Sequence, residues 1–528
     1  MAARRKPRRL HVVDTSDANP TGEARPVVRI IAGKRSEAID DAEAHLTERD
    51  LDLFQRGDFV VRLAPQDVDF GDGERVSAMR IVTVGSQHMR ERFTRAVDLQ
   101  KFDKRSENWV SIDCPNDFAE AYLERIGAWK LPPLRGVATA PSLRPDGSIN
   151  DSPGYDRATS VYYDPRGVEF PRVPVSLSKA DALAALEKLD SLLGTFDFVD
   201  EIDRSVARSG ILTAVLRRAM SAAPMHGVTA PVAGSGKSKL VSIPAILATG
   251  HPAPVIALGR REEEAEKRLG AVQIAGDQVI TIDNAEGPIG GELMCQAVTE
   301  PLVTIRILGT SSRLIVPNSV TWFATGNNLK FAGDMARRAL LCRLDPRCER
   351  PELREFETPD PGFVAQRDRP RLVVAALTIA RAFAIAGCPR EAPPLGSFAD
   401  WSKWVRDPLL WLGCVDPVDA MGEVRREDPK LSALAGVLEQ WSIAIDDRRV
   451  TAREVAEIAG QMAAVGLSHP DLREALLTVA ADRGEISTRR LGRWLGENKG
   501  REVAGKRIVP CEMEHGIGRW QLARLAHK

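Results

Sequence analysis

Apolar and polar residues alternate in two different patterns along the middle of the chain. Short apolar runs rich in β-branched residues occur at 279–282 and 320–325, and such runs are typical of buried strands. Apolar residues three and four positions apart, as at 183–193, are typical of amphipathic helices. The two patterns alternate from residue 226 to residue 345, which predicts an α/β domain built on a parallel sheet.

The pattern changes on both sides of this α/β segment and divides the chain into further parts. The first residues are basic and then polar, which is typical of a disordered tail, and a turn-rich α+β region follows whose role the sequence does not specify. In chain order, the predicted parts are a tail (1–26), an α+β accessory domain (27–175), a helical linker or collar (176–225), the α/β core (226–345), a helical lid (346–428) and a C-terminal domain (429–528).

One segment of the α/β core has the residue types that bind a nucleoside triphosphate. It has the sequence Ala-Pro-Val-Ala-Gly-Ser-Gly-Lys-Ser at 230–238. Glycines let backbone N–H groups approach phosphate oxygens closely, and a following helix adds its N-terminal dipole. Lys237 is predicted to pair with the β- and γ-phosphates and Ser238 to bind Mg²⁺. The predicted nucleotide-binding residues are Pro231, Gly234, Ser235, Gly236, Lys237 and Ser238, with Pro231 at the usual position of the first glycine.

Polar residues follow the two apolar runs. Asp283 comes directly after the first run, where its carboxylate is predicted to join the Mg²⁺ site. Asn284 occupies the next position, at which a hydrolysing ATPase usually has a carboxylate that polarises the attacking water. Glu286 is a candidate replacement for that carboxylate. Asn327 and Asn328 follow the second run and are predicted to orient the water or to sense the γ-phosphate.

Two pairs of arginines complete the candidate chemistry of the core. Arg306 and Arg313 flank a small polar turn between two apolar runs, which predicts a hairpin with a DNA-contacting tip. Arg337 and Arg338 lie beyond the second apolar run and are candidates to stabilise transition-state charge across a subunit boundary. The alternatives are solvated arginines in the hairpin and a structural Arg–Asp network at Arg337 and Arg338.

The order of these motifs resembles that of superfamily 3 helicases of the AAA+ class, and more closely the helicase half of phage and mobile-element primase–helicase proteins. The resemblance covers about residues 226–345. It implies an AAA+-like P-loop fold and a homo-hexameric ring that binds ATP and Mg²⁺ between subunits. It also implies that the Arg306–Arg313 hairpin faces a DNA channel. Pro231 and Asn284 depart from the family pattern, as does Pro244, which is predicted to end or kink the helix after the loop.

The C-terminal domain has three helix-start signals followed by a predicted hairpin. Thr451, Pro470 and Ser487 mark the helix starts. This order resembles a winged helix-turn-helix, whose third helix would enter a DNA major groove. A winged domain used for protein contact is the alternative. The predicted DNA-contacting residues are Arg489, Arg490, Arg493, Lys499, Arg501, Lys506 and Arg507.

Composition narrows the class of protein only slightly. The 528 residues include 73 Lys and Arg against 73 Asp and Glu, so net charge does not mark the chain as a nucleic-acid binder. It has no apolar run long enough to predict a membrane span. The 7 cysteines form no C-x-x-C pair, which favours reduced thiols in a cytoplasmic protein.

These patterns together predict an ATP-dependent DNA helicase or translocase that acts in the replication of a phage, plasmid or integrated mobile element. The expected partners are single-stranded or forked DNA, further copies of the chain and a separate primase. One alternative is an AAA+ ATPase that remodels protein–DNA complexes without unwinding. The other is a nucleotide-gated DNA-binding protein, which Asn284 suggests.

Overall fold

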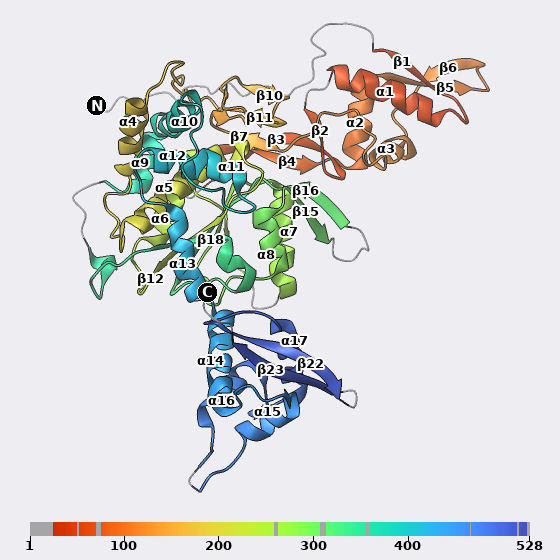
Figure 1. Ribbon diagram of the computed structural model, residues 1–528. Helices are drawn as coiled ribbons and strands as arrows, with labels where there is room; N and C mark the ends of the chain where they lie inside the picture. Colours follow the sequence, from red (N-terminus) through yellow and green to blue (C-terminus); the bar gives the residue numbers. More distant parts are fainter. Residues whose placement is uncertain are drawn as a thin grey trace, which may run out of the picture. The chain divides into compact units, whose positions relative to one another are not determined.

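The computed structural model describes residues 25–49, 52–69, 75–257, 262–306, 313–354, 359–464, 466–514 and 517–524. Internal contacts divide the chain into two compact units, which comprise 1–63 with 82–133, and 64–81 with 134–528 (Figure 1). Among the helices of the described residues, none is both long and apolar enough to span a bilayer.

The first unit is an α+β arrangement. Its sheet has the order β1-β5-β6, with β1 parallel to β5 and β5 antiparallel to β6. A second sheet has the order β2-β3-β4, and β3 and β4 contribute residues to both units. The elements are β1 (Val27–Ile30), α1 (Arg35–Arg49), β2 (Leu53–Arg56), β3 (Phe59–Asp69), β4 (Arg75–Thr83), α2 (Ser86–Ala96), β5 (Asp98–Asp103), β6 (Asn108–Ser111) and α3 (Asn116–Leu123).

The second unit begins with short strands in the turn-rich stretch. The pairs β8–β9 and β10–β11 are antiparallel, whereas β7 and β11 are parallel. Two helices then lead to the central sheet, and the first is stabilised by a capping box of Ser178 and Asp181. The elements are β7 (Gly136–Ala138), β8 (Ser142–Leu143), β9 (Ile149–Asn150), β10 (Gly154–Asp156), β11 (Val161–Tyr163), α4 (Lys179–Asp190), α5 (Glu201–Leu216) and the 3₁₀ turn Arg217–Ala219.

A five-stranded sheet with the order β13-β14-β17-β12-β18 forms the centre of the second unit. Every neighbouring pair in it is parallel, as the alternating pattern predicts. Strands β12, β14 and β17 are almost entirely buried, as is typical of the inner strands of a parallel sheet. The elements are β12 (Met225–Ala230), α6 (Lys237–Thr249), β13 (Val255–Ile256), α7 (Glu262–Ala275), β14 (Val279–Ile282), α8 (Glu292–Thr299), β15 (Leu302–Arg306), β16 (Arg313–Pro317), β17 (Thr321–Asn327), the 3₁₀ helix Gly333–Arg337 and β18 (Ala339–Arg343).

Pro244 does not end helix α6. The prediction of an early end is wrong, because the helix continues to Thr249 and closes on Gly250 in the left-handed region, at φ +88°. The helix is buried along its second half, with Ile243, Ala245 and Leu247 fully inaccessible. Tertiary packing therefore offsets the hydrogen bond that the proline cannot make.

Helices follow the sheet, and a C-terminal part of the second unit has its own apolar core. The predicted helix starts at Thr451, Pro470 and Ser487 are confirmed. The elements are α9 (Pro361–Arg367), α10 (Arg369–Ile385), α11 (Ala399–Trp401), a π-helical turn (Ser402–Arg406), α12 (Asp407–Trp411), α13 (Ala420–Arg426), α14 (Pro429–Ala444), β19 (Val450–Thr451), α15 (Ala452–Ala459), α16 (Pro470–Ala480), β20 (Ala481–Asp482), β21 (Glu485–Ile486), α17 (Thr488–Asn498), β22 (Lys506–Glu514) and β23 (Ile517–Arg524).

His226 in β12 makes the stability of the fold depend on pH. Its Nε2 lies 3.0 Å from the Ser209 hydroxyl, and complete burial lowers the pKa of the imidazole to about 3. An unfolded histidine has a pKa of about 6.5. Between these values the unfolded chain binds a proton that the folded chain does not, so the free energy of unfolding decreases as the pH falls.

We expect His226 to contribute a slope of about 1.4 kcal/mol per pH unit below about pH 6. Urea unfolding between pH 7 and pH 4.5 measures it. The His226→Asn variant is expected to show a shallower dependence than wild type, and His251→Asn, at a partly exposed position, serves as the matched control. Equal slopes for wild type and His226→Asn would contradict the assignment.

Candidate functional site

The carboxyl ends of three parallel strands bring the predicted site residues together. Strand β17 lies between β12 and β14 and pairs with both. Ala230 at the end of β12 is opposite Asn327, and the loop 231–236 follows it. Asp283 directly follows β14. This edge of an open parallel sheet is the place where α/β proteins bind ligands.

Two glycines give the loop between β12 and α6 its shape. Gly234 has φ +74° and Gly236 has φ +85°, both in the left-handed region, which side chains disfavour. A Cβ added at Gly236 would lie 3.3 Å from a ring carbon of Phe196. The backbone conformation therefore favours glycine at 236, and a Cβ there would crowd the Phe196 ring. Pro231, Gly234 and Ser238 are exposed, and Ser235 donates a hydrogen bond to the Val232 carbonyl at 2.8 Å.

The Lys237 ammonium lies over this loop and donates hydrogen bonds to three oxygens. They are the Val232 carbonyl at 2.9 Å, the Ser235 hydroxyl at 3.0 Å and the Asn327 amide oxygen at 2.9 Å. Partial burial lowers the pKa of Lys237, and the nearby Asp283 carboxylate opposes that shift. The side chain is thus held as a localised positive charge at the start of α6.

Ser238 and Asp283 form the oxygen-rich part of the site. The Ser238 hydroxyl donates to Asp283 Oδ1 at 3.4 Å, and the Thr325 hydroxyl donates to the same oxygen. A hydroxyl and a carboxylate are hard oxygen ligands of the type that Mg²⁺ uses together with nucleotide phosphates. In the described part of the chain, no cluster of three or more His, Cys, Asp or Glu forms a metal site.

The sequence reasoning did not identify Thr325 as a site residue. Its hydroxyl accepts a hydrogen bond from the Asn284 backbone at 3.0 Å while donating to Asp283. One sequence signal could have identified it. Thr325 is near the carboxyl end of its strand, and that strand neighbours the one that leads to Asp283. Thr325 therefore fixes both the carboxylate and the turn that follows it.

Backbone conformation explains the asparagines at 284 and 328. Both have positive φ values, +49° and +52°, in the region that asparagine tolerates better than most other non-glycine residues. Both side chains are exposed, as is Glu286. A glutamate at 284 would adopt this conformation less readily, so the residue type there follows from the tight turn after Asp283.

Arg337 and Arg338 lie at the opposite edge of the sheet from the loop. The Arg338 carbonyl accepts from the backbone of Met225, the first residue of β12, and the loop begins about 17 Å further along that strand. Arg338 donates to the Cys295 carbonyl at 3.0 Å and to the Thr299 hydroxyl at 2.9 Å. Both arginines pair with Asp334, and the Arg337 side chain is 61% exposed.

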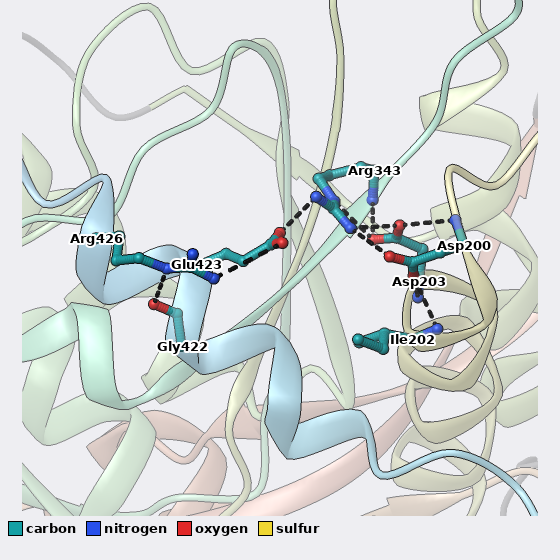
Figure 2. Close-up of polar contacts among 7 residues, drawn as sticks. All are labelled: Asp200, Ile202, Asp203, Arg343, Gly422, Glu423 and Arg426. Carbon is teal, nitrogen blue, oxygen red and sulfur yellow. Dashed lines mark hydrogen bonds and ion pairs between the residues drawn. The ribbon is translucent and has the colours of Figure 1, made fainter.

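An ion-pair network at the end of β18 was also missed, and within it the Asp203 side chain is buried. Arg343 ends β18 and pairs with Asp200 at 2.9 Å, with Asp203 at 3.0 Å and with Glu423 of α13 (Figure 2). Asp200 and Asp203 form the capping box of α5. Burial raises the pKa of Asp203, and its hydrogen bonds from Arg343 oppose the shift. The network joins α5, β18 and α13 at the carboxyl edge of the sheet.

The predicted DNA-contacting residues of the core lie at the end of a hairpin. Strands β15 and β16 are antiparallel, and Arg306 is opposite Arg313, which confirms the hairpin. The turn 307–312 and the side chains of both arginines lie outside the described residues.

The predicted DNA-contacting residues of the C-terminal domain lie on and beside α17. Arg489, Arg490 and Arg493 are exposed and line a concave surface with Asp482 and Ser487. Two of them have acidic neighbours, since Arg490 pairs with Asp482 at 3.4 Å and Arg493 with Glu497 at 3.5 Å.

The other four predicted contacts differ in exposure. Lys499 and Arg501 are exposed, whereas Arg507 is partly buried. Lys506 pairs with Glu439 of α14 and has a side chain that is only 20% exposed. The ammonium of Lys506 is therefore held within the domain.

Comparison with known proteins does not place the chain in a family. No protein-family model matches it, and no curated protein matches it. Among solved structures, it is similar to an apo structure of the NrS-1 C-terminal region, with 9% identity, a TM-score of 0.31 and coverage of 78% of this chain and 91% of that one. It is also similar to residues 305–718 of NrS-1, with 10% identity, a TM-score of 0.27 and coverage of 67% and 75%.

Proposed function

We propose that the carboxyl edge of the five-stranded sheet binds and hydrolyses ATP, and that the chain is an ATP-dependent DNA helicase or translocase of a phage, plasmid or integrated element. The observation that carries the proposal is the position of Lys237 and Ser238 at the start of α6. Both are within hydrogen-bonding distance of polar residues at the carboxyl ends of neighbouring strands, Asn327 and Asp283.

Each residue of the site would have a separate role in phosphoryl transfer. Backbone N–H groups of the loop and the N-terminus of α6 would hold phosphate oxygens, and Lys237 would pair with the β- and γ-phosphates. Ser238 and Asp283 would hold Mg²⁺, which neutralises phosphate charge when bound. The amide of Asn327 would orient the attacking water, and Glu286 is the nearest candidate in sequence for a proton acceptor.

Measurement of ATP hydrolysis with and without single-stranded DNA, followed by unwinding of a forked duplex, tests this proposal. DNA-stimulated hydrolysis together with unwinding is the expected result. Hydrolysis without unwinding would favour an ATPase that remodels protein–DNA complexes. The absence of hydrolysis under both conditions would refute the helicase and the remodelling functions.

Asn284 favours a nucleotide-gated DNA-binding protein as the second candidate function. The tight turn after Asp283 favours asparagine at 284 and leaves no carboxylate directly after Asp283, and an amide cannot accept the proton of an attacking water. For this function, ATP is expected to bind and to change the affinity for DNA without being hydrolysed. Equilibrium binding of labelled DNA with and without ATP distinguishes the two functions.

A ring with shared sites predicts that Arg337→Ala subunits inhibit wild-type subunits. The distance of Arg337 from the loop along the sheet means that it would act only on the site of a neighbouring subunit. An arginine supplied in this way contributes about 10³ to 10⁵ in kcat. We therefore expect ATP hydrolysis by mixtures to fall more steeply than the wild-type fraction.

The matched control for these mixtures is Arg367→Ala, an exposed arginine on α9 that pairs with Asp368. Its mixtures are expected to keep the wild-type rate. Arg338→Ala is measured in parallel, with its thermal unfolding, because Arg338 also binds groups of α8. A linear dependence on composition for both Arg337→Ala and Arg338→Ala would exclude a role across the subunit boundary.

A further inference from the structure

The sheet of the first unit has one covered face and one exposed face. Helices α1 and α2 pack on the covered face, where Val28 and Leu99 belong to the apolar core (Figure 1). Side chains alternate along a strand and share a face with their partners in register. The opposite side, here called the outer face, therefore carries Val27, Arg29, Asp98, Gln100, Phe102, Trp109 and Ser111.

Two aromatic rings lie next to each other on the outer face. Phe102 of β5 is opposite Trp109 of β6, and their ring centroids are 5.6 Å apart in an edge-to-face arrangement. The Arg29 guanidinium lies 4.8 Å from the centre of the Trp109 ring. Phe102 is 45% exposed and Val27 is 53% exposed. A cluster of large apolar side chains on an exposed surface is typical of an interaction site.

The chemistry of the outer face matches unpaired nucleobases. Exposed aromatic rings on a sheet stack with bases, and an arginine adds a cation–π contribution. The Gln100 amide and the Ser111 hydroxyl lie in register beside them and supply hydrogen-bonding groups for base edges. In a duplex the bases already stack on each other, so such a face selects single strands.

Basic groups lie on and beside the outer face. Arg29 lies on it, and exposed Lys104 and Arg105 directly follow β5, whereas Lys101 is in register with Val110 on the other face. Glu107 is exposed in the same turn, and the other two carboxylates of this region have local partners. Asp98 accepts from Gln100 at 2.8 Å, and Asp103 accepts from Ser106 and from the backbone of the following turn.

Arg25 adds a basic residue only two positions before β1. Basic groups combined with a stacking surface are typical of proteins that bind a single-stranded phosphate backbone.

We propose that the outer face of the β1-β5-β6 sheet binds single-stranded nucleic acid, with bases stacked on Phe102 and Trp109. The site lies entirely in the first unit and uses none of the residues of the ATP site. It gives this unit a function that does not depend on nucleotide hydrolysis, namely holding an unpaired strand.

Photocross-linking of the full chain, without nucleotide, tests the proposal. The probe is a single-stranded oligodeoxynucleotide that contains 5-iodouracil, and the cross-linked peptides are mapped. We expect cross-links within residues 98–111. The Trp109→Ala and Phe102→Ala variants are expected to lose these cross-links and to bind the oligonucleotide about 5- to 100-fold more weakly by fluorescence anisotropy.

Two control variants separate stacking from folding. Trp109→Phe keeps an aromatic ring and should retain most of the binding. Val110→Ala changes an exposed residue on the other side of the same strand and should bind as wild type does, and thermal unfolding verifies that each variant is folded. Unchanged cross-links and affinity in Trp109→Ala and Phe102→Ala would overturn the proposal, as would equal cross-linking of a blunt duplex. A change in oligomeric state without a change in cross-linking would instead assign the face to protein contact and overturn it too.

Discussion

We expect the Lys237→Ala substitution to lower kcat for ATP hydrolysis by about 10² to 10³. Its ammonium donates to Val232, Ser235 and Asn327, so these oxygens define the place where phosphate oxygens would bind. Charge that develops on the transferred phosphoryl group would lose its closest cation, and loss of one such stabilising group typically has an effect of this size. Steady-state ATPase kinetics of the purified variant measure the change.

Lys239→Ala is the matched control for this substitution. Lys239 lies two residues further along the same helix and pairs with Asp360, and its side chain is 62% exposed. Removal of its charge is expected to change kcat less than about 2-fold, as for other exposed ion pairs that contribute little. Hydrolysis that survives Lys237→Ala would show that the activity comes from another site or from a contaminating enzyme.

The second large effect is expected from Arg369→Leu. Arg369 begins α10, is 5% exposed and donates to the carbonyls of Ile246 at 3.0 Å and Leu247 at 3.1 Å. It also donates to the Thr139 hydroxyl at 2.9 Å. These carbonyls belong to the last turn of α6, where most carbonyls lack an intrahelical partner, although the Ile246 carbonyl also accepts from the Gly250 N–H at 2.8 Å. Burial lowers the pKa of Arg369 to about 10, so the side chain stays charged at neutral pH.

Removing this guanidinium removes the hydrogen bonds that it donates to the end of α6 and to Thr139. We expect the free energy of unfolding to decrease by about 3 to 5 kcal/mol, because each unsatisfied buried group costs about 1 to 3 kcal/mol. Urea denaturation followed by circular dichroism measures it. The matched control is Arg371→Leu, an exposed arginine in the same helix, which should change stability by less than about 0.5 kcal/mol. A similarly small effect of Arg369→Leu would show that water can replace Arg369 as hydrogen-bond donor to the last carbonyls of α6.

The sequence alone was sufficient where local rules decide the structure. The capping residues Ser487 and Thr451 predicted the starts of their helices, because a side-chain oxygen one residue before a helix satisfies its first N–H groups. No comparable signal fixed where the Thr451 helix ends, which is at Ala459, before Gly460. Helix ends are less strongly specified by sequence than helix starts with a cap.

The sequence also predicted the main features of the central sheet and of the loop 231–236. Continuous apolar runs predicted buried parallel strands, and strand direction then required Asp283 and Asn327 to lie at one edge with the loop. The sequence also predicted that glycines shape the loop, and the left-handed backbone at Gly234 and Gly236 agrees with this. These features depend on residues close together in the chain or on the period of the pattern.

Only the tertiary structure decided the features that depend on distant residues. Packing decided that α6 continues beyond Pro244. The Arg369 contacts at the end of α6 and the Arg343 network join segments more than 100 residues apart. No local sequence pattern encodes such contacts. Strand order placed Arg338 at the amino edge of the sheet, and packing on one side left Phe102 and Trp109 on the outer face. The sequence by itself thus determined which groups are present and which strands carry them, whereas packing determined what each group contacts.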